Sequence, residues 1–185
     1  MGFRIAMGLM FLVLTSSAFA HGTTQTAAWE RQALGQYLSE PGEGLPDFLK
    51  RVGSALYAYT NRTGNEACGL IATNGERFSV RLGTDGVQRG CAIHHSDIEG
   101  GFQSTGESIH SHPTRTTRLA DRDKAWMAAY GMPMASNWNI NRKVGFSPED
   151  FTGGPGWLVD NKQLFHQTGP GQVTKHGPIA KSVGP

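Results

Sequence analysis

Two histidines separated by one residue, His110 and His112, are the feature of this chain with the clearest capacity for chemistry. On an extended segment, side chains at positions i and i+2 point to the same side, so the two imidazoles can bind one metal ion together. A carboxylate precedes them at Glu66, and a hydroxyl and a second carboxylate follow at Ser147 and Asp150. Two imidazoles, one carboxylate ligand, a spare carboxylate that can act as a base and a hydroxyl are the groups of a catalytic zinc site.

The residues around these positions form three short boxes. Glu66 begins Glu-Ala-Cys-Gly, His110 begins His-Ser-His-Pro, and residues 146–150 are Phe-Ser-Pro-Glu-Asp. Boxes of these types in this order resemble the JAMM (MPN+) metalloproteases. The late third box is similar to the JAB-like variant found in bacterial toxin and Rhs-type proteins. The resemblance covers residues 46–168.

This resemblance implies an α/β fold, with a curved, mostly antiparallel sheet flanked by helices in a single domain. It also implies Zn2+ as the cofactor and hydrolysis of a peptide or isopeptide bond. Carried over residue by residue, it makes Glu66 the general base, which accepts a proton from the attacking water and passes it to the leaving amine. His110, His112 and Asp150 are the implied zinc ligands, and the Ser147 hydroxyl is the group that stabilises the oxyanion.

The third ligand is open, because the spacing departs from the family pattern. The family places the aspartate eleven residues after the second histidine, which is the position of Asp123, whereas Asp150 lies far beyond it. With Asp123 as the ligand, the family's serine position falls on Ala120, which has no hydroxyl. With Asp150 as the ligand, the family's serine position falls on Ser147, three residues earlier. We therefore expect Asp150 to bind the metal and Asp123, the alternative ligand, to lie in the first turn of a helix.

Two other functions are kept as alternatives. A mature N-terminal His21 could chelate copper through its amino group and imidazole, as in the lytic polysaccharide monooxygenases, which the start of the mature chain faintly resembles. A JAMM-like fold could also serve as a non-catalytic binding module without metal. The intact set of glutamate, histidine and aspartate residues argues against this second alternative.

The first twenty residues have the pattern of a secretory signal peptide. Arg4 gives a positive start, residues 5–14 are apolar but too few to span a bilayer, and residues 18–20 form a small-x-small cleavage site. We expect cleavage after Ala20, a secreted or periplasmic protein and no stable membrane insertion. With 17 basic and 15 acidic residues, the near-neutral chain is also not expected to bind nucleic acid. The expected partner is a protein or peptide substrate, such as a peptidoglycan peptide.

The chain has two cysteines, Cys68 and Cys91. In an oxidising compartment a pair favours a disulfide, which would stabilise the fold by roughly 3 kcal/mol on the chain-entropy model. Two buried free thiols are the alternative. A role as metal ligands is not expected, because neither cysteine belongs to a closely spaced Cys-x-x-Cys or Cys-x-x-His pair.

The remaining pattern divides the chain into elements that must position these groups. Residues 21–44 are expected to form a polar segment and a short helix over 28–39. A catalytic domain is expected over 45–168, and a disordered tail over 169–185. Within the domain, residues 114–145 form an insertion that is either a substrate-gripping lid or a packed excursion. The elements predicted inside the domain are helices over 45–60 and 119–130, and strands over 68–72, 77–82, 90–94, 106–110, 157–160 and 163–166.

Overall fold

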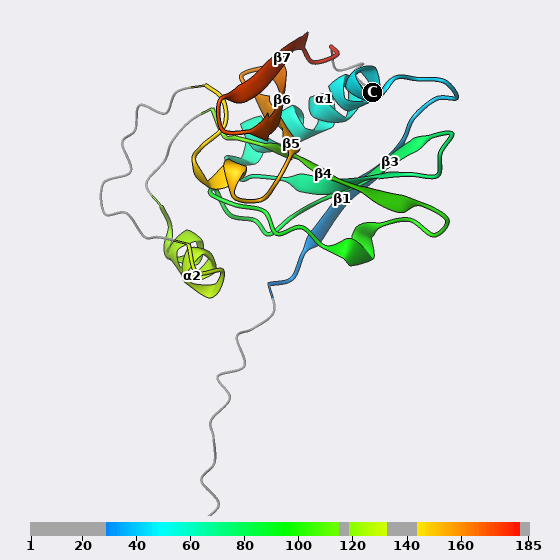
Figure 1. Ribbon diagram of the computed structural model, residues 1–185. Helices are drawn as coiled ribbons and strands as arrows, with labels where there is room; N and C mark the ends of the chain where they lie inside the picture. The colour runs from blue at the N-terminus through cyan, green and yellow to red at the C-terminus, as the bar shows by residue number, and fades with distance from the viewer. Residues whose placement is uncertain (1–28, 115–118, 133–143, 182–185) are drawn as a thin grey trace, which may run out of the picture.

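The structure, a computed structural model, describes residues 29–114, 119–132 and 144–181. The expected signal peptide, His21 and parts of the insertion lie outside these residues. The described chain forms a single α/β domain with a seven-stranded sheet in the order β1-β3-β2-β4-β5-β6-β7 (Figure 1). All neighbouring strands are antiparallel except β4 and β5. The elements are β1 (Gln32–Leu38), α1 (Leu45–Thr63), β2 (Cys68–Thr73), β3 (Phe78–Thr84), the 3-10 turn η1 (His95–Asp97), β4 (Gln103–Ser111), α2 (Asp121–Ala129), the 3-10 turn η2 (Glu149–Phe151), β5 (Gly156–Asp160), β6 (Gln163–Gly169) and β7 (Gln172–Pro178).

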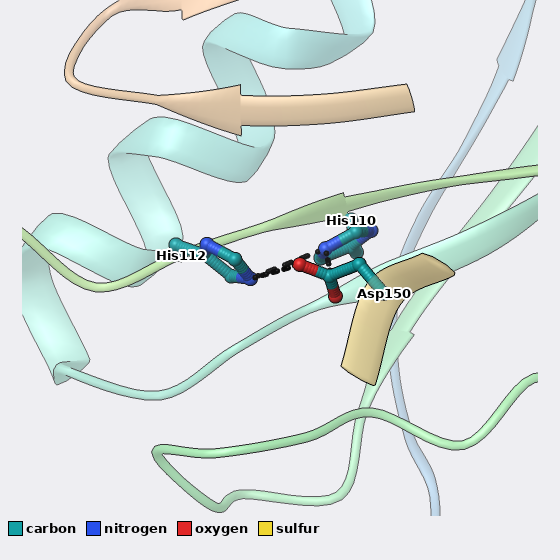
Figure 2. A group of neighbouring side chains, drawn as sticks. All are labelled: His110, His112 and Asp150. Carbon is teal, nitrogen blue, oxygen red and sulfur yellow. Dashed lines mark hydrogen bonds and ion pairs between the residues drawn. The ribbon is translucent and has the colours of Figure 1, made fainter. Parts of the chain in front are cut away.

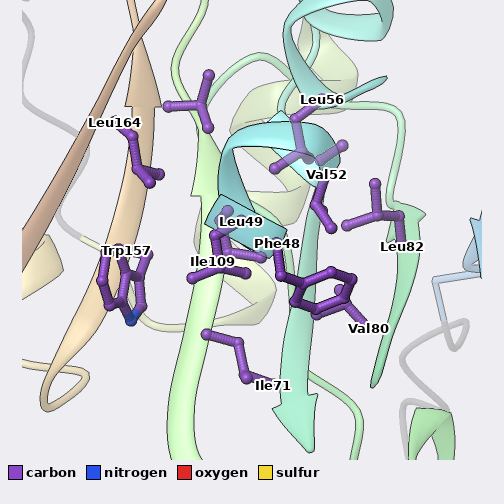
Figure 3. Close-up of a cluster of buried hydrophobic side chains, with 12 residues drawn as sticks. Phe48, Leu49, Val52, Leu56, Ile71, Val80, Leu82, Ile109, Trp157 and Leu164 are labelled. Atoms are coloured by element: carbon purple, nitrogen blue, oxygen red, sulfur yellow. The ribbon is translucent and has the colours of Figure 1, made fainter. Parts of the chain in front are cut away.

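Helix α1 covers one face of the sheet and builds the main core. A proline in its first turn suits the start of a helix, and Gly64 ends it in the left-handed conformation. The apolar residues of α1 recur every three to four positions, so one stripe of the helix faces the sheet. The helix predicted over residues 45–60 is confirmed and extends to Thr63. Figure 3 shows the core side chains, which include Phe48, Leu49, Val52 and Leu56 from α1 and Ile71, Ile109, Trp157 and Leu164 from the strands.

A hairpin joins β2 to β3, as the Asn-Gly pair predicts. Gly75 has a φ of 92°, and the Asn74 side chain accepts hydrogen bonds from the backbone N–H groups of Glu76 and Arg77. In the sheet, β2 lies between β3, its hairpin partner, and β4. As a result, the end of β2 that follows Glu66 lies next to the end of β4 that carries the histidines, with Cys68 opposite His110.

The segment between β4 and β5 contains α2. The prediction of a helix over 119–130 is confirmed, with the bounds Asp121–Ala129. Trp126 and Met127 of α2 form a second, smaller apolar cluster with Val87, which lies just after β3. This helix therefore packs beside the sheet and not on the face that α1 covers. Of the described helices, neither is long and apolar enough to cross a membrane.

The short helix predicted over 28–39 is wrong, because residues Gln32–Leu38 form β1, an edge strand paired with β3. The spacing of Leu34 and Tyr37 suggested a helix, since residues three apart on a regular strand point to opposite faces. A β-bulge between Ala33 and Gly35 shifts the register. The bulge adds one residue to β1 and so shifts the alternation of side chains between the two faces. Leu34 and Tyr37 can therefore both pack against the main core.

The disordered tail predicted over 169–185 is also wrong for the described residues of that range, since Gln172–Pro178 form β7 at the other edge of the sheet. The side chains of β7 are mostly exposed, so the strand depends on main-chain pairing with β6 and has little apolar pattern. Ile179 then packs against Gly53, and the Ala180 N–H donates to the Lys50 carbonyl of α1. These contacts fasten the end of the described chain to the core.

The strand predicted over residues 90–94 does not form. Side chains occupy the main-chain groups that a neighbouring strand would use. The Ala92 N–H donates to the carboxylate of Asp85, and the Ala92 carbonyl accepts a hydrogen bond from Arg31. Residues 90–94 therefore form a loop that is fixed by partly buried polar contacts.

Candidate metal centre

The end of β4 places the two histidine side chains together. Main-chain hydrogen bonds hold the backbone extended at the end of β4 and one residue beyond it. The Ser111 N–H donates to the Ala67 carbonyl, and the His112 N–H donates to the Val159 carbonyl. Because His110 and His112 are two positions apart on this extended backbone, their rings lie on the same side of the sheet. Their Nε2 atoms are only 3.2 Å apart, so both rings direct one nitrogen to the same small volume.

Asp150, in the turn η2, lies against both histidines (Figure 2). Its Oδ1 is 3.1 Å from Nε2 of His110, and its Oδ2 is 3.4 Å from Nε2 of His112. Within the described ranges these three residues form the one group of histidine, cysteine or acidic side chains compact enough to hold a metal ion. The histidine pair and Asp150 are thus brought together from segments far apart in the sequence, as the sequence predicts.

The carboxyl group of Asp150 stays ionised in this setting. Burial raises the pKa of Asp150. The charges of His110 and His112, and their hydrogen bonds to the carboxylate, outweigh the effect of burial and hold the pKa far below its usual range. Metal binding requires an ionised carboxylate and neutral imidazoles, so a bound metal ion would take the place of the histidine protons beside Asp150.

Two further residues hold Asp150 in place. The N–H and the hydroxyl of Ser147 both donate to Oδ2 of Asp150, at 2.6 and 2.9 Å, an arrangement related to the capping box of a helix start. The buried Gln167 on β6 donates from its side-chain amide to the carbonyls of Asp150 and Gly154. Sequence reasoning missed Gln167, because nothing in the sequence indicates that β6 passes behind this loop.

Glu66 lies two residues before the buried start of β2 and beside the histidines. Its backbone is fixed on both sides, since its N–H donates to the Val87 carbonyl and its carbonyl accepts from the Thr84 hydroxyl. The carboxylate Oε1 is 4.0 Å from Nε2 of His112. This separation is too long for a direct hydrogen bond and suits a carboxylate that acts on a group held between it and the histidines.

Asp123, the alternative third ligand, has a different role. Its carboxylate accepts hydrogen bonds from the N–H of Ala120, at 2.9 Å, and from the N–H of Gln88, at 2.6 Å. These bonds satisfy the start of α2 and connect the helix to the loop after β3. The structure therefore leaves Asp123 out of the metal group and confirms its expected place in the first turn of a helix.

The predicted disulfide between Cys68 and Cys91 is present. It ties the start of β2 to the loop of residues 90–94. Arg31 reinforces the same connection, because its guanidinium donates to the carbonyls of Cys68 and Ala92. It also forms an ion pair of 2.7 Å with Asp97.

A pocket of about 630 Å³ opens beside the metal group. Glu66, His110 and Asp150 line it on the side of the sheet, and both cysteines contribute to its wall. Trp126 and Tyr130 line it from α2 and the residue that follows the helix. The predicted insertion is therefore part of the pocket. No match to this chain was found among protein-family models, curated proteins or solved structures.

Proposed function

We propose that this protein is a zinc-dependent amide hydrolase of the JAMM type, acting on peptide or isopeptide bonds. The observation that carries the proposal is the convergence of His110, His112 and Asp150 beside a pocket that two of them, His110 and Asp150, line. The carboxylate of Glu66 lies 4.0 Å from Nε2 of His112. The mostly antiparallel α/β fold and the order of the three sequence boxes support the same proposal.

The three donor groups suit zinc. Ligands about 2 Å from a tetrahedral ion lie about 3.3 Å from one another. The separations here are 3.2 Å between the two Nε2 atoms, and 3.1 and 3.4 Å from these atoms to the nearest oxygens of Asp150. Two imidazoles and one carboxylate form a three-ligand set that leaves a fourth position for catalysis. This complete set disfavours the alternative of a metal-free binding module.

In the proposed mechanism, zinc supplies a Lewis acid that polarises the amide carbonyl and makes water more acidic. Glu66 accepts the proton of the attacking water and delivers it to the leaving amine. The Ser147 hydroxyl, which donates to Asp150 in the structure, turns to the substrate oxygen as negative charge develops there. Gln167 and the backbone of Ser147 keep the loop of Asp150 in place during this exchange.

We further propose that the protein acts outside the cytoplasm, as a secreted or periplasmic enzyme. The signal-peptide pattern of residues 1–20 supports export, and the Cys68–Cys91 disulfide suits an oxidising compartment. The substrate is then a protein or a peptide of that compartment, and peptidoglycan peptides belong to this class.

The variant Glu66→Gln tests the proposal. We expect it to fold and to bind zinc like the unmodified protein but to lose hydrolysis, because an amide cannot carry the proton. Hydrolysis is measured as new amino groups released from a denatured protein, a polyubiquitin chain and a muropeptide preparation. Glu107→Gln is the matched control, because Glu107 lies on β4 outside the pocket lining. Full turnover by Glu66→Gln, or loss of turnover in both variants alike, would contradict the assignment of the base.

A further inference from the structure

The pocket beside the metal group is much larger than a metal ion and water require. Its volume of about 630 Å³ lies in the range of sites that enclose a small organic ligand or part of one. The metal group occupies one side of it. Another part of the lining is formed by Ile93, Tyr130 and Met132, which come from the loop after β3 and from the end of α2.

This part of the lining, the apolar side of the pocket, is unusually apolar for an exposed surface. The large hydrophobic side chains that are exposed in the described ranges are Ile93, Tyr130, Val144 and Val173, and the first two line the pocket. Ile93 is 38% exposed and Tyr130 is 46% exposed. Two large exposed apolar groups in one pocket mark a surface that gains free energy when an apolar ligand covers it.

Buried contacts fix this apolar side relative to the sheet. The indole N–H of Trp126 donates to Asp85 at 2.8 Å, and the same carboxylate oxygen accepts the N–H of Ala92 at 2.9 Å. The Trp126 ring lies so close to Gly90 that any side chain at this position would collide with it. The ring of Tyr130 packs on Trp126 with their centroids 4.4 Å apart. The site is therefore largely formed before a ligand arrives.

The charged groups of the lining select against an anionic ligand. Glu66, Glu149 and Asp150 line the pocket beside His110, and the described lining contains no lysine or arginine. A carboxylate placed against the apolar side would lose its hydration and meet like charges. An uncharged aliphatic or aromatic group meets neither penalty.

We propose that Ile93, Tyr130 and Met132 form a subsite for an uncharged apolar side chain of the substrate, next to the amide bond that is cleaved. The position of the cleaved bond rests on the proposed function, because it is set by the metal group. The binding of the apolar side chain does not depend on zinc. The subsite makes an amide flanked by a leucine-like or phenylalanine-like side chain the preferred substrate.

Two amides of matched shape test the subsite in metal-free protein. In 4-methylpentanamide an isopropyl group stands where succinamate has a carboxylate. The probe is the methyl resonance of Met132 in protein labelled at its methionine methyl groups, assigned with Met132→Leu. We expect 4-methylpentanamide to shift this resonance in a saturable way and succinamate to leave it in place. An equal shift with both amides, or no shift with either, would overturn the subsite.

A pair of variants locates the binding. Tyr130→Ser should weaken the binding of 4-methylpentanamide about tenfold, because the aromatic side of the subsite is lost. Val173→Ser is the matched control, since Val173 is also 46% exposed but lies on β7, outside the pocket lining. Equal affinities of the two variants would refute the placement. Because neither zinc nor hydrolysis enters the measurement, its failure is distinguishable from a failure of the proposed function.

Discussion

Two clusters of histidine and carboxylate groups lie on this sheet, and they differ in how the rings are presented. In the metal group, the ring edges of His110 and His112 face each other and the Asp150 carboxylate, with nitrogens 3.2 Å apart. The second cluster consists of Glu107, Trp157, His166 and His176, and we call it the aromatic cluster. There the His166 ring stacks on Trp157, with the centroids 4.2 Å apart and the planes at 18°.

The difference shows that residue type alone does not define a metal site. In the aromatic cluster, the Glu107 carboxylate already has two partners. One oxygen accepts a hydrogen bond of 2.5 Å from the indole N–H of Trp157, and the other lies 3.2 Å from Nε2 of His166. The His176 ring lies 4.8 Å from Trp157 and its Nε2 is buried, with no hydrogen-bond partner in the described ranges. In the aromatic cluster, the stacked ring faces stabilise the sheet. In the metal group, the converging ring edges leave nitrogen lone pairs that can bind a metal ion. Strand alternation separates the clusters, because Glu107 and His110 are three positions apart on β4.

The largest expected effect distinguishes the two aspartates that compete for the third ligand position. Asp150→Asn should cost zinc affinity and essentially all activity, because an amide is a much weaker ligand than a carboxylate. Asp123→Asn should keep zinc and lose some stability, since Asp123 caps α2. Zinc titration and thermal unfolding of both variants check this. The assignment is wrong if zinc affinity falls in Asp123→Asn and not in Asp150→Asn.

A smaller effect is expected from the hydroxyl that holds Asp150. Ser147→Ala should retain zinc and lower turnover about 10²-fold, the usual scale for the loss of one oxyanion donor. Ser147→Thr keeps a hydroxyl at this position and should recover most of the turnover. Steady-state kinetics on the substrate identified for the unmodified protein provide the measurement. Turnover unchanged in Ser147→Ala would remove the serine from the mechanism and leave it a purely structural role.

The smallest effect concerns the aromatic cluster and appears in stability. Burial, followed by the charges of His166 and Lys50, lowers the pKa of His176 from 6.5. The unfolded chain therefore takes up a proton that the folded protein resists, so this stabilisation is present above about pH 6.5 and is lost as the pH falls towards the folded pKa. His176→Phe keeps an aromatic ring but cannot titrate.

We therefore expect the melting temperature of His176→Phe to fall less than that of the unmodified protein between pH 7.5 and 5.5. The difference should be about one or two degrees in a domain of this size. Thermal unfolding of both proteins across this range checks it. An identical pH dependence in the two proteins would show that His176 titrates as it does in the unfolded chain.

The sequence predicted the metal group because its chemistry is local and periodic. The i, i+2 spacing of His110 and His112 settles their common direction, and Ser147 identifies Asp150 as the better third ligand. The sequence could not predict Gln167 or Tyr130 as parts of the site. Gln167 reaches the loop of Asp150 from β6, and Tyr130 reaches the pocket from the end of α2. Both depend on long-range packing that leaves no pattern in the neighbouring residues.

The fold shows the same division between local and long-range signals. Helix α1 and the β2–β3 hairpin follow from apolar periodicity and from an Asn-Gly turn, and both were predicted. The edge strands β1 and β7 were not predicted. A bulge gives β1 the apolar spacing of a helix, and β7 is formed by main-chain pairing that leaves its side chains exposed. The formation of such edge strands depends on pairing with the neighbouring strand more than on their own composition.

Zinc content tests the central claim most directly. Elemental analysis of protein purified without residues 1–20 should find about one zinc per chain. His110→Ala and His112→Ala should each abolish it, because a three-ligand site does not survive the loss of one ligand. His166→Ala and His176→Ala, in the aromatic cluster, should retain it. Zinc that persists in the double variant of His110 and His112, copper that is lost on His21→Ala, or a chain without metal would contradict the account.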